Sequence, residues 1–243
     1  MKNNLLRLPP ITNPHPGPSL KLSKRLQQIE QMVASDYTHI WDCCCDHGFL
    51  GTALLSRQSA SQIHFVDIVP ELIAELDSRL QRLYSDSASS WKTHCLDVAK
   101  LPLEQYAGKQ LIIIAGVGGD LIIQFIEALH QKHPKLNIDF LLCPVHHQFT
   151  LRQKLIDLNF SLKDETLIEE KQHFYEVILV SSETNESALI SPVGHRIWQS
   201  ASVEQSLVVE TYLNRKLNHY NRIQQGNNAN VEHIIEAYRA ITL

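Results

Sequence analysis

The sequence predicts an α/β fold in which a doubly wound sheet of seven strands is followed by a C-terminal helical hairpin. Short apolar runs alternate with amphipathic segments of helix length between residues 39 and 158. This pattern is typical of parallel strands in a sheet that helices cover on both faces. Two strand-like runs then follow at 161–169 and 173–181, with only a short polar turn between them. Beyond the polar segment SSETNES, residues 192–243 keep helical spacing alone.

The individual elements follow from this spacing. The first helix begins after Ser23, whose hydroxyl suits a helix N-terminus, and runs to about Ala34. We expect further helices at 50–58, 70–84, 119–131 and 149–158, and parallel strands at 39–44, 62–67, 91–96, 110–115 and 138–144. The last two runs form a hairpin, which adds at least one antiparallel strand to this Rossmann-like sheet. In the C-terminal region, QQGNNAN separates two predicted helices.

A chain of 243 residues is long enough for one well-buried domain and an appendage. We divide it into an extended basic arm at 1–20, a core domain at 21–185 and a helical appendage at 190–243. Five prolines keep the arm irregular. The first 25 residues carry five basic side chains and no acid: Lys2, Arg7, Lys21, Lys24 and Arg25. This segment is either a solvated tail or a local nucleic-acid contact in a chain of formal net charge −4.

Composition restricts the class of protein. Hydrophobic residues make up 44% and charged residues 20%, which argues against disorder. No apolar run approaches the roughly 18 to 20 residues that cross a bilayer. The N-terminus, broken by prolines, does not resemble a secretory signal. We therefore expect a cytoplasmic protein without membrane contact, whose five cysteines are reduced thiols.

Ligands of a parallel sheet lie at the carboxyl ends of its strands, and acids follow three of the predicted strands. Asp42 ends the first, with Gly48 shortly beyond it. Asp67 ends the second, where an acid accepts hydrogen bonds from the ribose hydroxyls of an adenosine; a helix cap is the alternative. Asp97 follows the third strand, either as a turn residue or as an acceptor for an adenine amino group.

The segment AGVGG follows the fourth strand at 115–119. Its glycines permit positive φ and close approach of backbone to a ligand. They also lead into a helix whose free N–H groups point back at the pocket. Because a structural turn needs only one or two glycines, we favour a ligand-binding loop that includes Ala115, Gly116 and Gly118.

The three adjacent cysteines at 43–45 allow three interpretations. Zinc and iron–sulfur sites need spaced pairs of ligands, and Cys95 and Cys143 fall inside other strands, so we predict no metal site. Redox chemistry needs a resolving partner, which the sequence does not offer convincingly. We favour small side chains at a crowded strand end, with Cys44 filling the place of a glycine. His47 is the one histidine in this predicted pocket, where it either orients a carboxylate or packs.

Assembled, these residues resemble the bacterial tRNA adenine-N1 methyltransferases that modify position 22, over about residues 20–181. The matching segments are LSKRLQQI at 22–29, WDCCCDHGFL at 41–50 against D-x-G-S-D-H-A-Y-L, AGVGG at 115–119 against A-G-M-G-G, CPV at 143–145, LRQKLIDLNF at 151–160 and FYEVILV at 174–180. Several positions depart from the family pattern. Cys44 replaces a glycine, Cys45 a serine, Gly48 an alanine and Val117 a methionine.

The resemblance implies S-adenosyl-L-methionine (SAM) as cofactor and tRNA as partner. The cofactor-binding residues would be Asp42, Cys44, Gly48, Asp67, Asp97, Ala115, Gly116 and Gly118. Asp46 would be the catalytic carboxylate that accepts from the adenine amino group and balances the cation that forms, with His47 orienting it. Phosphate contacts would come from Lys24, Arg25, Arg215, Lys216 and Arg222. We expect a monomer or a weak dimer.

Two other function classes stay open. A degenerate methyltransferase fold that serves as an RNA-binding or scaffold protein is motivated by Cys44 and by the acidic net charge. A nicotinamide-dependent oxidoreductase is disfavoured because the first loop lacks G-x-G-x-x-G.

Overall fold

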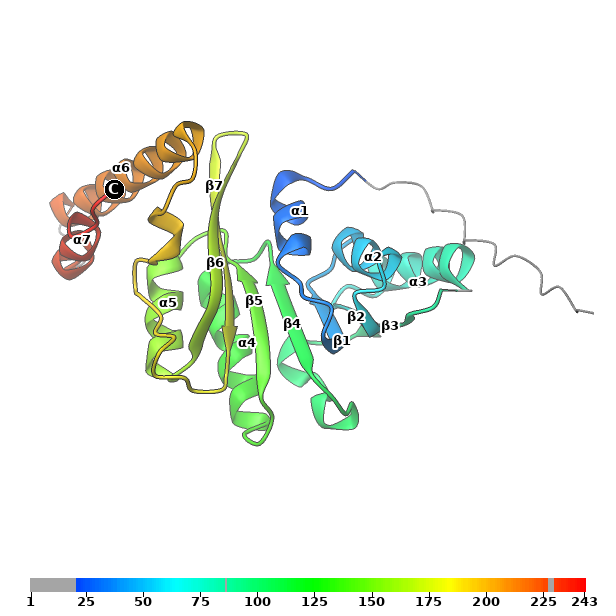
Figure 1. The fold of residues 1–243 in the computed structure, drawn as a ribbon. Helices are drawn as coiled ribbons and strands as arrows, with labels where there is room; N and C mark the ends of the chain where they lie inside the picture. Colours follow the sequence, from blue (N-terminus) through cyan, green and yellow to red (C-terminus); the bar gives the residue numbers. More distant parts are fainter. Residues whose placement is uncertain (1–20, 86, 227–229) are drawn as a thin grey trace, which may run out of the picture.

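The computed structural model describes residues 21–85, 87–226 and 230–243. One sheet of seven strands forms its centre, in the order β3-β2-β1-β4-β5-β7-β6 (Figure 1). The strands are β1 (Tyr37–Cys43), β2 (Ala60–Asp67), β3 (Ser90–Cys95), β4 (Gln110–Ala115), β5 (Ile138–Cys143), β6 (Ser161–Glu170) and β7 (His173–Ser181). The predicted basic arm at 1–20, with Lys2 and Arg7, lies outside the described residues.

The helices of the core are α1 (Lys24–Gln31), α2 (Phe49–Ser56), α3 (Pro70–Tyr84), α4 (Gly119–Lys132) and α5 (Gln148–Asp157), and those of the C-terminal hairpin are α6 (Val203–Gln225) and α7 (Glu232–Arg239). Short 3₁₀ turns occupy Val98–Lys100, Leu103–Gln105 and Arg196–Trp198. Each predicted core helix and strand is found within about three residues of its predicted bounds. The first helix is shorter than expected, since it ends at Gln31.

Pairing in the sheet confirms a parallel core with one reversed strand. β1 pairs in parallel with β2 and β4, while β3 and β5 extend the sheet on either side. β7 runs antiparallel to both β5 and β6. The two-residue connection between β6 and β7 permits only this reversal, because a parallel pair needs a crossover. The predicted doubly wound α/β fold is therefore confirmed.

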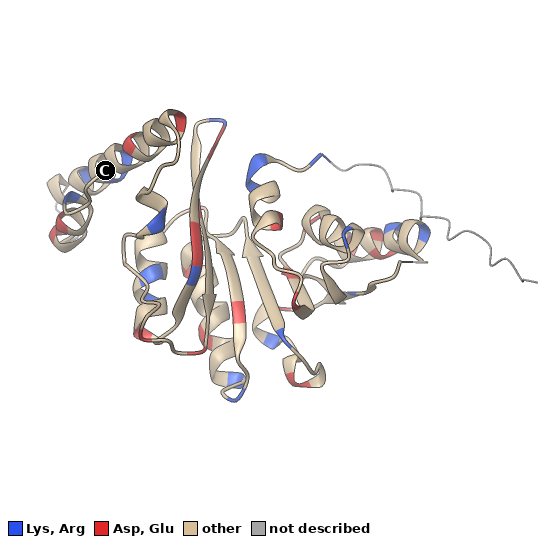
Figure 2. Ribbon diagram, in the orientation of Figure 1, with Lys and Arg blue, Asp and Glu red and all other residues tan. Residues whose placement is uncertain are grey.

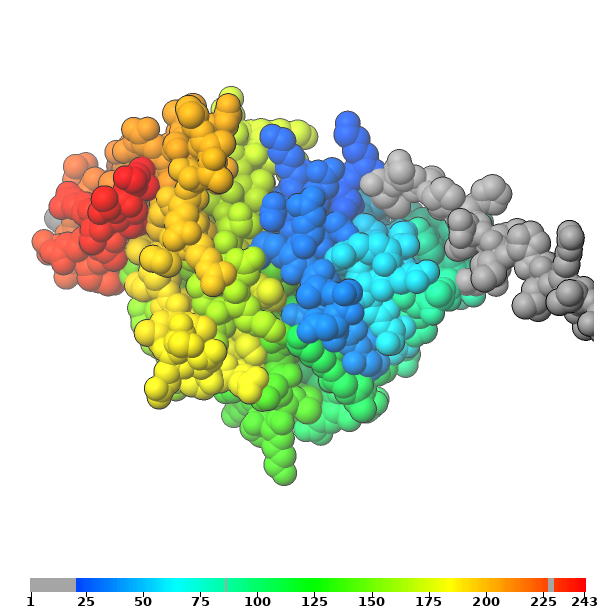
Figure 3. All heavy atoms as spheres, in the orientation of Figure 1, coloured from blue at the N-terminus to red at the C-terminus, as the bar shows by residue number. Residues whose placement is uncertain are grey.

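Hydrophobic side chains pack on both faces of the sheet. On one face, Ile29, Leu54 and Leu80 from α1, α2 and α3 share a buried cluster with the strands. On the other face, Ile126 of α4 and Leu155 of α5 do the same. The space-filling view shows α1 between α2 and the β6–β7 hairpin (Figure 3). Helices therefore pack on both faces of the sheet, and the loops that carry the predicted site project from its carboxyl edge.

The C-terminal hairpin packs on α5 and β6 through a third apolar cluster, which includes Trp198, Val209 and Tyr238. It forms one end of the molecule (Figures 1 and 3). In the part of the chain that the structure describes, no helix is long and apolar enough to span a membrane.

A buried charged network joins the hairpin to the core. Arg152 of α5 is fully buried and donates from Nε to Glu176 Oε2 at 2.7 Å. Arg152 Nη1 also lies 2.7 Å from Glu165 Oε2. Tyr212 of α6 donates to Glu176 Oε1 at 2.5 Å, and the backbone N–H of His195 donates to Glu165 at 2.6 Å. Five separate segments thus meet in this network: α5, β6, β7, the linker that contains His195, and α6.

Three histidines on neighbouring strands form a hydrogen-bonded row. His39 Nδ1 lies 3.1 Å from His64 Nε2, and His64 Nδ1 lies 2.9 Å from His94 Nε2. The central ring is fully buried and stacks on Trp41 with 3.7 Å between ring centroids. Burial, together with the neighbouring His94, lowers the pKa of His64 to about 2, and burial lowers that of His94 to about 4. These rings stay neutral at physiological pH.

Candidate functional site

A cavity of about 240 Å³ opens where β1 and β4 end. Its walls come from α1, from the loop between β1 and α2, from the start of α2 and from the segment after β4. They comprise Arg25, Leu26, Asp42, Cys43, Cys44, Cys45, Asp46, His47, Phe49, Leu50, Ala115, Gly116 and Val117. These are the strand ends at which the sequence predicts the ligand.

The cysteine segment forms the bend at the end of β1. Cys44 has φ 55° and Asp46 has φ 50°, both in the left-handed region that favours glycine. The N–H of Cys45 donates to Val66 O at 3.1 Å, and the N–H of Gly48 donates to Cys45 O at 2.7 Å. Cys44 therefore adopts the conformation of a loop glycine. Burial raises the pKa of its thiol to about 11, so the thiol is protonated at neutral pH.

Asp42 lies on the cavity wall with only 4% of its surface exposed. Its Oδ2 accepts a hydrogen bond of 2.8 Å from the N–H of Gly51 in α2. Burial raises the pKa of Asp42 to about 7, because that single N–H donor offsets only part of the lost hydration. Gly48 caps α2 with φ 65°, behind the cavity lining.

Asp67 and Asp97 lie at the tips of the neighbouring strands, outside the cavity lining. Asp67 is buried and accepts one backbone N–H on each oxygen, from Asp46 at 3.0 Å and from Val69 at 3.1 Å. It thus fixes the loop after β1 against the end of β2. Asp97 accepts the N–H of Ala99 at 2.9 Å and caps a 3₁₀ turn. The turn alternative raised for Asp97 describes this contact. Asp67 does not cap α3, whose N-cap is Val69 and which has no side-chain capping hydrogen bond.

The glycines of AGVGG serve two different purposes. Gly116 has φ 83°, and a Cβ placed there would meet only the Arg25 guanidinium, at 3.9 Å. Gly118 and Gly119 instead allow the loop after β5 to pack closely against the start of α4. A Cβ on Gly118 would collide with the His146 ring, and one on Gly119 would lie 2.8 Å from the His146 carbonyl oxygen. Only Gly116 therefore presents its backbone to the cavity.

Arg25, expected from the sequence as a phosphate contact, lines the cavity instead. Its guanidinium lies 5.0 Å from the Tyr175 ring centroid and faces Gly116. A guanidinium thereby lines the same cavity as the buried Asp42. The helical register of α1 determines this position, and the sequence alone did not reveal it.

Asp46 and His47 both line the cavity, and both are exposed, at 69% and 47% of their side-chain surface. His47 Nε2 lies 3.6 Å from Asp46 Oδ1, which is an ion-pair distance rather than a hydrogen bond. The Phe49 ring lies 5.7 Å from the His47 ring and is 41% exposed. Phe49 was not singled out from the sequence, although its place directly after D-H-G could have indicated an aromatic wall.

A second acid and histidine lie beyond the glycine segment. Asp120 is in the first turn of α4, and His147 immediately precedes α5. His147 Nδ1 lies 2.6 Å from Asp120 Oδ2, a direct hydrogen bond. The sequence placed only His47 in the pocket, so His146 and His147 were missed. The position of CPVHH after a parallel strand was the signal that could have placed them near the site.

The other predicted RNA contacts differ in their exposure. Lys24 is exposed at the start of α1, and Arg222 is exposed on α6. Figure 2 shows basic positions, in blue, on both of these helices. Arg215 is exposed but donates to Gln172 O at 2.8 Å. Lys216 is half-buried, donates to Gln148 Oε1 at 2.7 Å and lies 5.2 Å from the Tyr212 ring. Lys216 therefore belongs to the packing of α6 on α5, which corrects its expected role as an open phosphate contact.

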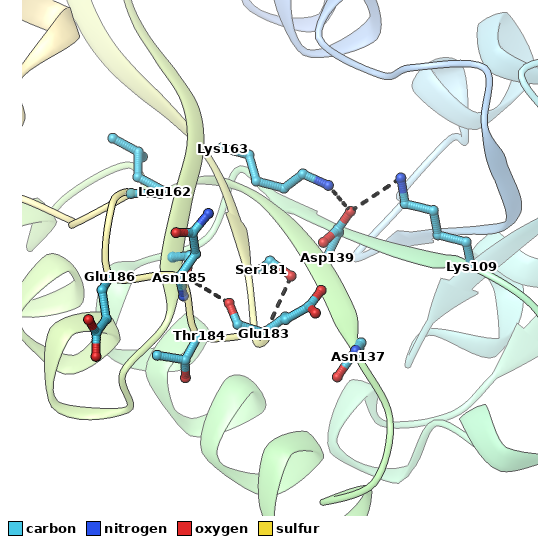
Figure 4. Close-up of a pocket in the computed structure, with 12 residues that line it drawn as sticks. Lys109, Asn137, Asp139, Leu162, Lys163, Ser181, Glu183, Thr184, Asn185 and Glu186 are labelled. Carbon is cyan, nitrogen blue, oxygen red and sulfur yellow. Dashed lines mark hydrogen bonds and ion pairs between the residues drawn. The ribbon is translucent and has the colours of Figure 1, made fainter.

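A larger cavity of about 740 Å³ lies at the opposite edge of the sheet, where β4, β5 and β6 begin (Figure 4). Asp139 Oδ2 accepts there from Tyr37 at 2.8 Å and from Lys163 at 2.5 Å, with Lys109 at 3.9 Å. The two lysines that line this cavity, Lys109 and Lys163, are thus already paired with a carboxylate. None of the predicted site residues lines it.

Within residues 21–85, 87–226 and 230–243, no group of three or more histidine, cysteine, aspartate or glutamate side chains could hold a metal ion. The five cysteines are free thiols in this structure.

The fold and its site can be compared with known proteins. A methyltransferase domain family model matches residues 22–178. A comparison with curated protein sequences finds no match. Among solved structures, M. capricolum TrmK in complex with S-adenosyl-homocysteine shares 18% identity, with a TM-score of 0.70 over 90% of this chain and 96% of that one. Streptococcus pneumoniae Sp1610 in complex with SAM shares 19% identity, with a TM-score of 0.68 over 90% and 98%.

The B. subtilis m1A22 tRNA methyltransferase TrmK shares 22% identity, with a TM-score of 0.66 over 91% of this chain and 98% of that one. These structures show that the described chain has their fold, C-terminal helices included. Since the family model spans the whole parallel core and the cavity lies where that sheet binds its ligands, the chain belongs to the methyltransferase domain family.

Proposed function

We propose that the protein is a SAM-dependent RNA methyltransferase that acts on N1 of an adenine in tRNA. The observation that carries this proposal is the cavity between the left-handed Cys44 bend and the open backbone of Gly116. Support for the acceptor comes from structures of the same fold that are described as TrmK, one of them as an m1A22 tRNA methyltransferase.

The cavity residues fit the amino-acid part of SAM. The Arg25 guanidinium suits its carboxylate, and the Asp42 carboxylate suits its ammonium. Gly116 leaves room for backbone contact, since a Cβ there would meet nothing nearer than Arg25. Asp67 still has unused lone pairs for ribose hydroxyls, because the structure gives each of its oxygens one donor.

Bound SAM supplies a methyl group on a sulfonium, which an adenine N1 lone pair takes by in-line displacement. The chain's main contribution is orientation, which contributes several kcal/mol to such a step. Asp46, exposed at the cavity mouth, accepts from the amino group of the target adenine and balances the developing cation. A base drawn from a tRNA stem must also leave its stack, at a cost of a few kcal/mol. The exposed Phe49 ring offers it a stacking surface.

The test is to incubate the protein with isotope-labelled SAM and total tRNA, then to map the labelled base. We expect label at N1 of one adenine. Arg25→Gln should weaken binding of S-adenosyl-homocysteine about tenfold, since it removes a charged pair with the ligand carboxylate. Asp46→Asn should reduce transfer and leave that binding nearly unchanged.

His195→Ala is the matched control, because His195 is exposed in the linker before α6. tRNA binding without any transfer of label would refute the proposal and favour a non-catalytic RNA-binding protein.

A further inference from the structure

The hydrogen-bonded pair of Asp120 and His147 has no part in the proposed function so far. Their side chains are about half exposed, at 57% and 53%, and the hydrogen bond between them is 2.6 Å long. Asp120 follows the fourth strand and His147 follows the fifth. Both residues therefore lie at the carboxyl edge of the sheet, like the cavity.

The backbone fixes this pair to the cavity wall. The N–H of Val145 donates to Val117 O at 3.0 Å, and the N–H of Gly119 donates to His146 O at 3.0 Å. The His146 ring fills the space that a Cβ of Gly118 would take. The His147 backbone adopts φ 60°, a conformation that this double connection holds in place. Because Val117 lines the cavity, the pair is rigidly connected to it.

The strand order places the pair on the acceptor side. Asp67 and Asp97 lie on β2 and β3, on one side of β1, whereas β4 and β5 lie on the other. If Asp67 held the adenosine of SAM, the loops after β4 and β5 would lie on the other side of β1 from it. α6 borders the same region, because Lys216 of α6 donates to Oε1 of Gln148, the residue after His147, at 2.7 Å.

The chemistry of the pair suits an adenine amino group. An ionised carboxylate only accepts, so in the neutral His147 ring Nδ1 carries the hydrogen and Nε2 keeps its lone pair as an acceptor. When adenine N1 takes the methyl group, the N1–C bond forms and the sulfonium keeps the electron pair of the broken C–S bond. The base becomes a cation that shares its charge with the N6 amino group. An acceptor at N6–H is bound more strongly in that transition state than before it.

We infer that His147 accepts a hydrogen bond from the N6 amino group of the target adenine and that Asp120 is the positioning residue that fixes its tautomer. This inference rests on the proposed function. It assigns the amino group a second acceptor beside Asp46, one on each N6 hydrogen.

The test is a double-mutant cycle between protein and RNA. After the methylated adenine is mapped, a tRNA transcript is made with purine, which keeps N1 but lacks the amino group, at that position. His147→Ala should slow single-turnover transfer to adenine about tenfold, the equivalent of one hydrogen bond. It should cause no further loss on the purine transcript. Asp120→Asn should slow this transfer less than His147→Ala does, since the amide oxygen of the new asparagine still accepts from Nδ1 of His147.

A second measurement does not depend on turnover. In the presence of S-adenosyl-homocysteine, wild-type protein should bind the adenine transcript more tightly than the purine one, and His147→Ala should reduce that preference to the part that Asp46 supplies. His195→Ala should retain it. Equal losses on both transcripts would show that His147 only supports the loop and would overturn the inference. A wild-type protein that methylates no adenine would overturn the proposed function itself.

Discussion

Cys44 takes a backbone conformation that its side chain disfavours. A non-glycine residue in the left-handed region costs roughly 1–2 kcal/mol, and Cys44 stands there with φ 55°. Two backbone hydrogen bonds of the next residue, from the Cys45 N–H to Val66 O and from the Gly48 N–H to Cys45 O, hold the bend. The cysteine is thus a tolerated substitute for glycine rather than a chemical group of the site.

The change in the free energy of unfolding when Cys44 is replaced should depend on how easily the new residue adopts positive φ, and not on the loss of the thiol. Cys44→Gly should change the free energy of unfolding by less than about 1 kcal/mol, because relief of strain offsets the entropy that glycine loses on folding. Cys44→Val should lose about 1–3 kcal/mol, since a β-branched residue fits this region poorly. Urea unfolding measures both changes. If the glycine variant proved as unstable as the valine variant, the thiol itself would be the stabilising group.

The residues of the site divide into those that sequence can place and those that it cannot. Asp42, Cys44 and Asp46 follow a strand directly, so their position at its carboxyl end could be predicted. His146 is 28 positions beyond Gly118, and only the folded sheet brings its ring against that glycine. The position of Arg25 likewise depends on how α1 is rotated against the sheet, and no local sequence pattern predicts that rotation.

At the scale of elements, the row of histidines across β1, β2 and β3 has one arrangement of hydrogens. The Ala107 carbonyl oxygen can only accept, so His39 Nε2, 3.2 Å away, carries a hydrogen. His39 Nδ1 then accepts from His64 Nε2, and His64 Nδ1 accepts from His94 Nε2. A proton added to His64 Nδ1 would face the hydrogen of His94, which is a reason beyond burial for its low pKa.

This row should make the fold sensitive to acid. His64 has a folded pKa of about 2 against about 6.5 when unfolded, so the unfolded chain binds more protons between these values. The stability that the neutral His64 contributes to the folded state is therefore fully present above pH 6.5 and is lost as the pH falls. The loss should reach about 2 kcal/mol at pH 5 relative to pH 7. Asp42 acts in the opposite direction, because its raised pKa makes the folded state the better proton binder below pH 7.

The variant His64→Gln isolates this contribution. Urea unfolding of wild type and variant at pH 5 and pH 7 should show that the variant loses less stability on acidification, by about 2 kcal/mol. The exposed His195→Gln serves as the control and should follow the wild type. Identical pH dependence in wild type and His64→Gln would contradict the hydrogen-bonded row.

The sequence predicted these strands but not their lateral order. The alternation of apolar runs with helical segments predicted a parallel sheet. The short turn after β6 predicted that the next strand runs antiparallel to it. That β1 lies between β2 and β4, and that β7 inserts between β5 and β6, depends on which faces the helices cover. The histidine row was missed for the same reason, since its members are 25 and 30 residues apart along the chain.

For the whole molecule, the Arg152 network determines how the C-terminal hairpin is attached to the core. One guanidinium faces two buried carboxylates, so its removal leaves uncompensated charge. The nearby guanidinium and the backbone N–H groups of His195 and Arg196 together lower the pKa of Glu165, even though burial opposes this. The hairpin and the core should therefore unfold together.

Arg152→Met should lower the free energy of unfolding by about 3–5 kcal/mol, because Glu165 and Glu176 would be buried without a partner. Tyr212→Phe removes only the hydrogen bond to Glu176 and should lose about 1–3 kcal/mol. Lys154→Met is a matched control, since Lys154 pairs with Glu127 on the surface of the same region, and it should change little. A loss in Arg152→Met no larger than that of the control would mean that apolar packing alone attaches the hairpin.

The buried carboxyl of Asp42 links ligand loading to the acidity of the medium. Near neutrality this group is about half ionised, and a cation seated beside it would favour the ionised form. Uptake of SAM should then release a fraction of a proton near pH 7, and so should uptake of the thioether product, which keeps the same ammonium. Titration calorimetry in two buffers of different ionisation enthalpy would detect this release. Both ligands would then be held more tightly in slightly alkaline surroundings than in slightly acidic ones.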